Sequence, residues 1–479
     1  MMDSRKIISN LIWRFCERIG AQGVSMIVSI VLARLLAPSV YGTVALITVF
    51  TTLLQVFVDS GLGSALVQKK DADDLDFSTV FYFNLLMCSV LYLVMFFAAP
   101  FIAAFYESPE LTPVIRVVSL ILIISGVRNV QQSYVSKQMA FKRFFYATIS
   151  GTIVSGVVGI AMAYGGYGVW ALVAQMLVNL AVGTVVLWFT VKWRPKFMFS
   201  FSRLKKLFSY GWKLLVSSLI NTAYNDLRKM IIGKVYTKDD LAFYERGSQF
   251  PSVAVTNINA SIDSVLFPAM SASQDDKNAV KTMTRRAIKT STYILFPVMI
   301  GLGVCAKPIV SLVLTDKWLP CVPFMYIYCF TYAFQPIHTA NLNAIKAIGR
   351  SDMFLKLEII KKILGLAVIL ITIPYGVMTM AYGMIITSVA SQIINSWPNK
   401  KLLDYSYLEQ LKDMLPSMGL SILMGVIVSL VGLLGLGNIL TLVIQVVLGV
   451  GIYLGGSILF RLECFEYVIG LIKKFLHKR

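Results

Sequence analysis

The chain has 479 residues, of which 57% are hydrophobic and 14% are charged, and its mean hydropathy is +0.73. Soluble domains carry roughly 25% charged residues, so this composition excludes a soluble globular protein and predicts a membrane protein. The net charge of +20 would suit nucleic acid, anionic lipid or membrane topology, and the positions of the charges decide among these.

Fourteen mainly apolar stretches of about 20 residues, the length of a membrane-spanning helix, follow one another along the chain. The connections between them are short, which favours helices over barrel strands. The sequence therefore predicts an all-α integral membrane protein with about 14 transmembrane helices. We expect these spans at residues 15–36, 41–66, 79–104, 113–135, 145–164, 168–191, 211–233, 242–268, 290–314, 322–345, 357–374, 377–397, 415–435 and 438–460.

Basic residues are distributed unequally between the two sides of these spans. The side that holds both termini has 32 of the 44 lysines and arginines, whereas the other side has only Lys234, Lys238 and Lys317. Lysine and arginine stay on the cytoplasmic side of inner membranes, so we expect both termini in the cytoplasm. The excess charge is thus mainly topological, and nucleic-acid binding is excluded as its explanation.

The first twelve spans form two weakly similar repeats. Residues 107–120 correspond to 315–328, and 164–173 to 375–384, at offsets of about 207–211 residues. Internal repeats are typical of transporters. We predict an N-terminal six-helix bundle, a cytoplasmic amphipathic linker, a C-terminal six-helix bundle, two additional spans and a basic cytoplasmic tail, at residues 1–191, 192–210, 211–397, 398–464 and 465–479.

Polar residues recur at helical spacing in the first, second, seventh and eighth spans. Spacings of three and four place residues on one helix face, and a charge at mid-bilayer costs about 2.5–3.5 kcal/mol on insertion scales. We expect these four helices to enclose a hydrated, cationic cavity. The alternative is that pairs such as Asp226 and Lys229 only neutralise each other between packed helices.

The candidate substrate-binding residues are Arg18, Arg128, Arg228, Arg246, Gln249 and Gln335. The candidate ion-coupling residues or counter-ions are Glu17, Asp59, Asp226, Asp263 and His338. For His338 a structural role is the alternative to a proton relay. Coupling to Na⁺ or H⁺ is left open.

Enzyme and metal motifs are not expected in this sequence. The six cysteines form no C-x-x-C pair, and no nucleotide-binding G-x-x-x-x-G-K-[ST] pattern occurs. The acidic clusters at 71–74 and 239–240 lie in short loops, so we interpret them as solvated charge rather than as a glycosyltransferase site. We therefore expect no catalytic residue, no metal site and no cofactor.

Several segments, taken in order, resemble the bacterial polysaccharide flippases of the MOP superfamily, the Wzx type. They are LARLLAPSVYGTVAL (32–46), DSGLGSALVQKKD (59–71), GYGVWALVAQ (166–175), WRPKF (193–197), FYERGSQFPS (243–252) and NAIKAIGR (343–350). The likeness is greatest to the colanic-acid exporter and lipopolysaccharide biosynthesis subgroup. One departure is FYERG, where the family pattern has a small residue in place of Glu245 or Arg246, and this added charge is expected to tune the substrate.

This resemblance implies two six-helix bundles in a V-shaped, MATE-like, alternating-access arrangement, with two further C-terminal helices. It also implies a substrate, an oligosaccharide repeat unit on undecaprenyl diphosphate, that is moved to the periplasmic leaflet of the inner membrane for surface polysaccharide synthesis. Polymerase and chain-length proteins would be its partners, beside membrane lipids. The rival functions are a cation-coupled multidrug exporter of the same superfamily and a membrane polysaccharide polymerase.

Overall fold

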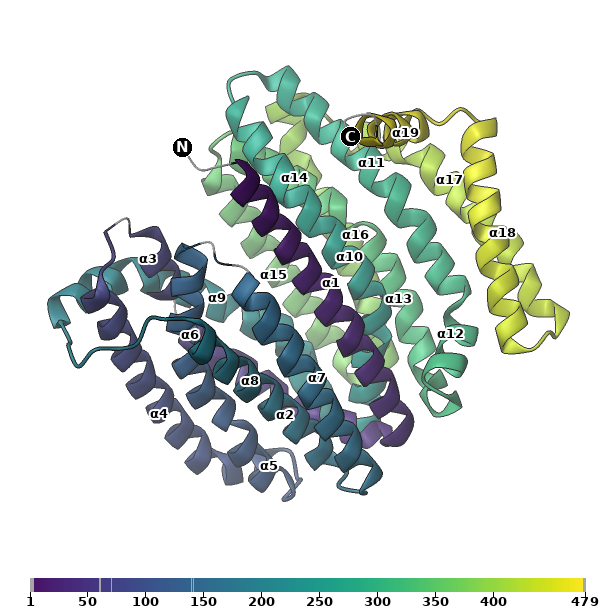
Figure 1. Cartoon of the computed structure of the whole chain (residues 1–479). Helices are drawn as coiled ribbons and strands as arrows, with labels where there is room; N and C mark the ends of the chain where they lie inside the picture. The colour runs from purple at the N-terminus through teal and green to yellow at the C-terminus, as the bar shows by residue number, and fades with distance from the viewer. Residues whose placement is uncertain (1–3, 60–61, 70, 139, 141, 477–479) are drawn as a thin grey trace. The chain divides into compact units, whose positions relative to one another are not determined.

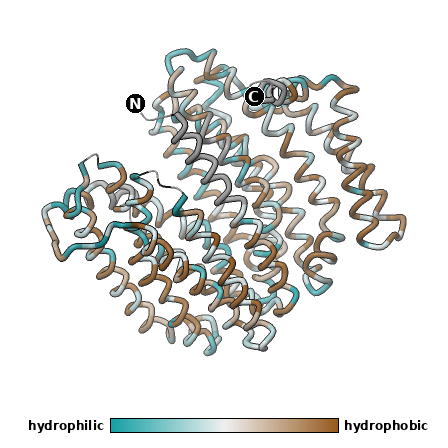
Figure 2. Tube along the Cα trace, viewed as in Figure 1, coloured by the Kyte–Doolittle hydropathy of each residue, from teal (hydrophilic) through white to brown (hydrophobic). Residues whose placement is uncertain are grey.

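The computed structural model describes residues 4–476 except 60, 61, 70, 139 and 141, and within these residues all regular structure is helical. The predicted all-α fold is confirmed. Nine of the described helices are long and apolar enough to cross a membrane, and Gly20–Leu35 is a shorter apolar helix. Figure 2 shows hydrophobic residues along many of the helix shafts and hydrophilic residues at many of the turns. The chain is thus a multi-pass membrane protein.

The chain divides into two compact units, Met1–Ala242 and Phe243–Arg479. Figure 1 labels their helices. The first unit contains α1 (Ser4–Leu35), α2 (Pro38–Asp59), α3 (Leu62–Gln68), α4 (Asp74–Phe105), α5 (Leu111–Val118), α6 (Leu120–Lys137), α7 (Lys142–Tyr164), α8 (Val169–Thr190), α9 (Phe201–Val235) and the first residues of α10 (Lys238–Ala272).

Local sequence explains where several of these helices begin. Proline is favoured in the first turn of a helix, and Pro38 opens α2 directly after the α1 turn. A capping box opens α4, because the Asp73 carboxylate accepts from the Asp76 amide at 3.0 Å and the Asp76 carboxylate accepts from the Asp73 amide at 3.2 Å. Gly168, with φ of +53°, precedes α8 in a conformation that glycine adopts without strain.

The segment that precedes α9 is anchored to the first unit. Trp193 is buried among Phe77 and Phe81, and its indole N–H donates to Asp74 at 3.1 Å. The capping backbone amide of Asp76 lowers the pKa of the Asp73 carboxyl, and so does the Arg203 guanidinium, which lies 2.8 Å from it. The acidic cluster at 71–74, expected to be solvated, is thus partly paired with the linker.

The second unit continues with α11 (Lys277–Val304) and ends with the amphipathic α19. Its other elements are α12 (Ala306–Val313), η1 (Asp316–Cys321), α13 (Val322–Ala333), α14 (Gln335–Ala347), α15 (Ser351–Thr372), η2 (Ile373–Tyr375), α16 (Val377–Leu403), α17 (Tyr407–Val431), η3 (Gly432–Leu434), α18 (Asn438–Leu459) and α19 (Glu463–Leu476). Helix α17 packs against α11 and α18, and Tyr293, Leu420 and Tyr453 form part of a common core.

The predicted spans all fall on helices, but four of them contain two α-helices each. The second span contains α2 and α3, the fourth α5 and α6, the ninth α11 and α12, and the tenth α13 and α14. Helix α9, the seventh span, packs against α2, α3 and α4 and so belongs to the first compact unit. The two six-helix bundles with boundaries at 191 and 211 stay a prediction.

Candidate functional site

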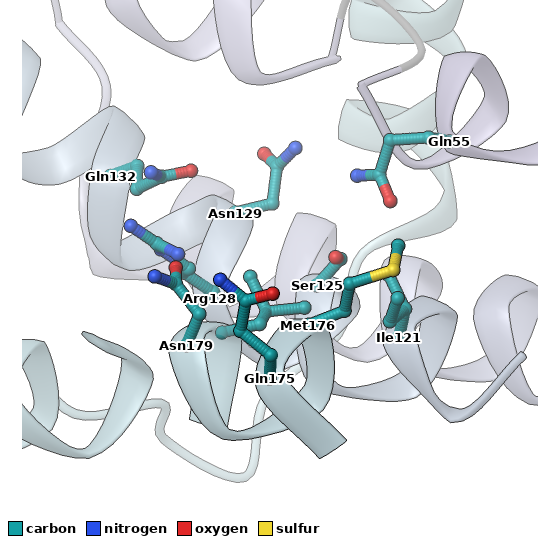
Figure 3. A pocket seen from close by; sticks show the side chains of 10 residues that line it. Gln55, Ile121, Ser125, Arg128, Asn129, Gln132, Gln175, Met176 and Asn179 are labelled. Carbon is teal, nitrogen blue, oxygen red and sulfur yellow. The ribbon is translucent and has the colours of Figure 1, made fainter. Parts of the chain in front are cut away.

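A cavity of about 590 Å³ lies within the first unit, between α2, α6 and α8 (Figure 3). Its polar lining consists of five carboxamides, one hydroxyl and one guanidinium. These side chains are Gln55, Ser125, Arg128, Asn129, Gln132, Gln175 and Asn179, and Ile121, Met176 and Leu180 complete the wall.

Helical periodicity places these residues on one wall. In α6, Ser125, Arg128 and Gln132 follow at spacings of three and four, and in α8, Gln175 and Asn179 are four residues apart. Such spacings put side chains on the same face of a helix. The cavity lining is therefore a direct consequence of two short polar stripes in otherwise apolar spans.

Glycines let neighbouring helices approach behind this wall. A Cβ at Gly183 of α8 would lie 3.5 Å from Nη1 of Arg128 and 3.2 Å from the Ala147 carbonyl oxygen. A Cβ at Gly151 of α7 would lie only 2.7 Å from the Asn179 carbonyl oxygen. Side chains larger than hydrogen would have to displace the helices here, so these glycines help to place Arg128 and Asn179 at the cavity.

Hydrogen bonds fix two of the amides at the edge of the cavity. The Asn129 amide donates to the Val58 carbonyl at 3.1 Å, which joins α6 to the end of α2. The Asn179 amide donates to the Ser155 hydroxyl at 3.2 Å, which joins α8 to α7. A lining held by such contacts is pre-organised for a polar ligand.

The charge of the lining determines which ligands it suits. Arg128 is the one charged residue among the described side chains that line the cavity. Guanidinium groups bind phosphate and carboxylate oxygens with forked hydrogen bonds. Carboxamides donate and accept at once, as the hydroxyl groups of a sugar require. The arrangement suits a glycan that carries an anionic group.

The other sequence candidates of the first unit lie apart from this lining. Asp226 is buried and lies 3.2 Å from the ammonium of Lys229, as the neutralising alternative requires. The Nε atom of Arg228 is buried and has no hydrogen-bond partner among the described residues. The side chains of Glu17, Arg18 and Asp59 lie outside the described residues.

The second-unit candidates are held mainly by protein contacts. Arg246 is buried, lies 4.8 Å from the centre of the Trp318 ring and donates to Gln249. His338 Nδ1 lies 3.1 Å from the Asn395 amide nitrogen. Gln335 is exposed at the first residue of α14, and the side chain of Asp263 lies outside the described residues.

Sequence reasoning included Arg128 but missed most of its neighbours in the cavity. Gln55 lies on the second span, for which the sequence predicts a polar face, whereas the stripes of α6 and α8 are not predicted. The spacing of Ser125, Asn129 and Gln132 is a signal that could have revealed the α6 face. The wider cavity expected between the first, second, seventh and eighth spans stays a prediction.

Comparison with known proteins places this geometry in context. Residues 31–323 match a family described as "Polysaccharide biosynthesis protein". The chain is 24% identical to the teichuronic acid biosynthesis protein TuaB of Bacillus subtilis (strain 168) over 351 residues, which cover 72% of each protein. It is 23% identical to the lipopolysaccharide biosynthesis protein WzxC of Escherichia coli (strain K12), over 82% of this chain and 79% of WzxC.

A solved structure also has a similar fold. The inward closed conformation of the lipid II flippase MurJ matches with a TM-score of 0.76, over 95% of this chain and 99% of MurJ, at 17% sequence identity. At this identity the likeness concerns the fold alone. It agrees with the expectation of a transporter-like helical membrane fold.

Proposed function

We propose that this chain, which belongs to the polysaccharide biosynthesis protein family of MOP-superfamily flippases, moves a lipid-linked oligosaccharide across the membrane. The observation that carries the proposal is the cavity of the first unit, in which Arg128 lies among carboxamides. This lining matches a substrate with sugar hydroxyls and an anionic linkage.

More specifically, the proposed substrate is an oligosaccharide repeat unit linked to undecaprenyl diphosphate. Arg128 contacts an anionic group of the head, and Gln132, Gln175 and Asn179 hydrogen-bond the sugars, while the lipid tail remains in the bilayer. Transport proceeds by alternating access from the cytoplasmic to the periplasmic leaflet of a bacterial inner membrane. A membrane potential that is negative inside favours this direction by about 2.3 kcal/mol per negative charge and 100 mV.

The remaining candidate residues have secondary roles in this proposal. Arg18, Arg228 and Arg246 are further anion contacts, and Arg246 is secondary to Arg128 because its guanidinium already lies on Trp318. Gln249 and Gln335 are polar contacts. The candidate counter-ions, through which Na⁺ or H⁺ coupling would act, are Glu17, Asp59, Asp226, Asp263 and His338.

The wider cellular setting follows from the same proposal. Both termini lie in the cytoplasm, and the product is passed to polymerase and chain-length proteins. The protein acts without hydrolysing a nucleotide. An exporter of cationic drugs would need an acidic lining, whereas the charged residue of this cavity is Arg128.

The direct test is translocation of a lipid-linked oligosaccharide in proteoliposomes. We expect Arg128→Gln to reduce the transport rate about 10- to 100-fold, because a charge-assisted hydrogen bond contributes about 1.5–3 kcal/mol. Arg128→Lys should retain part of the rate, since it keeps the charge without the forked geometry. The matched control is Arg143→Gln at the start of α7, which lies outside the cavity lining.

Three results would contradict the proposal at different levels. If Arg128→Gln transported at the wild-type rate, Arg128 would not be the anion contact of the first-unit cavity. If Arg228→Ala and Arg246→Ala both transported at the wild-type rate, these two arginines would not contact the substrate. No translocation of any lipid-linked oligosaccharide by the wild-type protein, with headgroup, glycan and membrane potential varied, would overturn the flippase function itself.

A further inference from the structure

The segment between α8 and α9 exposes phenylalanines beside lysines. Residues 192–208 contain six lysines and arginines and no aspartate or glutamate. Phe197 is fully exposed, and Phe199 and Phe201 are 51% and 72% exposed. Lys205 and Lys206, near the start of α9, are exposed too. We call these five residues the basic–aromatic strip.

Contacts on the inner side hold this segment against the first unit. The Lys196 backbone amide donates to the Ser78 hydroxyl of α4 at 3.0 Å. The Ser200 backbone amide donates to the Thr79 hydroxyl of α4 at 3.1 Å, and Leu204 is buried in the core. Because the inner side is fixed, the fold itself directs the phenylalanines outward. A row of exposed aromatic rings of this kind marks an interaction surface.

The cations of the segment fall into two groups. Lys196 lies 2.6 Å from the Asp74 carboxylate, and Arg203 lies 2.8 Å from the Asp73 carboxylate, so these two cations are neutralised within the protein. By contrast, no described carboxylate lies within 4 Å of the ammonium group of either lysine of the strip. The strip therefore keeps a net positive charge beside its exposed rings.

Ring contacts place the strip beside the membrane-spanning part of α4. Phe197 stacks on Tyr82 with ring centres 6.1 Å apart, and Phe208 lies 6.4 Å from Phe83. Helix α4 has 32 residues, or about 48 Å, and the hydrocarbon core is about 30 Å thick, so a centred α4 projects about 9 Å at each end. Tyr82 lies about 12 Å from the start of the helix at Asp74, close to the hydrocarbon boundary. A side chain exposed at this depth meets lipid.

The depth and the charge of the strip together identify its partner. We propose that the basic–aromatic strip is an interfacial anchor that binds the surface of an anionic phospholipid leaflet, with its phenyl rings at the acyl boundary and its lysines on the phosphates. Apolar side chains enter this boundary, and a basic residue near an anionic surface raises the affinity for it about fivefold. The leaflet is the cytoplasmic one on the topology of the proposed function, on which this assignment of the side rests.

Photocrosslinking identifies what the strip contacts. Benzoylphenylalanine, a photoreactive phenylalanine analogue, replaces Phe201 of the full-length protein in bilayers of equimolar phosphatidylglycerol and phosphatidylcholine. We expect lipid adducts, with phosphatidylglycerol at least about fivefold in excess. The analogue at Phe97, which is exposed within α4, should label both lipids equally, and the analogue at Asp71, which is exposed before α4, should label neither.

Two lysine pairs separate the strip from general surface charge. With the analogue at Phe201, Lys205→Gln combined with Lys206→Gln should abolish the preference for phosphatidylglycerol while lipid adducts persist. Lys400→Gln combined with Lys401→Gln removes the same charge from adjacent exposed lysines in the last turn of α16 and should keep the preference. Equal labelling of the two lipids by the protein with all its lysines would overturn the anionic surface as the partner.

Hydrogen exchange of the unmodified protein provides a measurement that does not depend on the folding of a variant. The backbone amides of residues 197–206 should exchange more slowly in phosphatidylglycerol bilayers than in phosphatidylcholine bilayers. Unchanged exchange, no lipid adduct at Phe201, or crosslinking of that position to a protein in native membranes would each overturn the proposal. None of these measurements involves transport, so a failure of the anchor is distinguishable from a failure of the flippase function.

Discussion

In the first unit, the carboxamides of Gln55, Gln132 and Gln175 line a cavity, whereas in the second unit those of Asn341, Asn399 and Gln410 hydrogen-bond one another. The side-chain carbonyl of Asn341 accepts from the Asn399 side-chain amide at 2.6 Å and from the Gln410 side-chain amide at 3.1 Å. The side-chain amide of Asn341 donates to the Gln410 side-chain carbonyl at 2.9 Å. All three side chains of this second group are fully buried.

The comparison separates two uses of the same residue types within apolar spans. An amide whose partners are other amides stabilises the packing of α14, α16 and α17, and a ligand could reach it only by breaking the network. An amide at a cavity keeps hydrogen-bonding capacity for a ligand. Polar composition therefore does not identify a binding site until the partners of each group are known.

The largest expected effect is the loss of the buried amide network of the second unit. Asn341→Leu would leave the buried amides of Asn399 and Gln410 short of partners, and we expect it to lower the free energy of unfolding by about 2–3 kcal/mol. Thermal unfolding in detergent would measure this as a clear fall in Tm. Gln335→Leu, at the exposed start of the same helix, is the control and should leave Tm nearly unchanged. Equal Tm values for both variants would break the comparison.

The second effect concerns the open cavity and should appear in transport rather than in stability. Replacing Gln132 and Gln175 together by leucine removes two sugar contacts, and we expect the transport rate to fall about 10-fold, since a net hydrogen bond contributes about 0.5–1.5 kcal/mol. Tm should change little. Met176→Leu alters the same lining without removing a strong hydrogen-bonding group and should transport normally. If the Gln132 and Gln175 double variant instead had a much lower Tm and normal transport per folded molecule, the cavity amides would stabilise the fold rather than bind the substrate.

The order of spans was predictable from the sequence, because long apolar runs and basic loops carry that information locally. The division of the fourth span at Ser119 was not, since apolar residues flank this serine on both sides. The tenth span divides at Phe334, two residues before Pro336, and that proline is a local signal that the span prediction did not use. Nor could spacing distinguish the cavity-facing stripe of α6 from the buried amide network of α14. That distinction depends on which residues of distant helices lie opposite, such as Asn399 beside Asn341.

A third, smaller effect tests Arg246, which was predicted as a substrate contact and lies on the Trp318 ring. Cation–π contacts contribute about 0.5–2 kcal/mol, so we expect Arg246→Leu to lower the free energy of unfolding by about 1 kcal/mol. Its transport per folded molecule should fall less than that of Arg128→Gln. The exposed Arg350 provides a control, because Arg350→Gln should change neither quantity measurably. A transport loss equal to that of Arg128→Gln would place both arginines in substrate binding.

The smallest effect is expected at ion pairs outside the cavities, where water screens the charges. In the first unit, Glu107 lies 2.8 Å from the ammonium of Lys234, and Glu110 pairs with Lys238, so each lysine lowers the pKa of its carboxylate. A lowered carboxyl pKa adds stability that is complete above the unfolded value, about 4.3, and is lost as the pH falls through the folded value.

We therefore expect the contribution of these two ion pairs to Tm to stay constant from about pH 7 to pH 5. Below about pH 4 this contribution is lost, and Tm should decline slightly. Glu107→Gln combined with Glu110→Gln should remove that part of the acid decline and lower Tm a little at neutral pH. Asp71→Asn, at an exposed carboxylate, is the control and should keep the decline. If the double variant instead lowered Tm as much as Asn341→Leu, exposed charge pairs would rival the buried amides. The contrast between amides at a cavity and amides that hydrogen-bond one another would then no longer account for the stability of the fold.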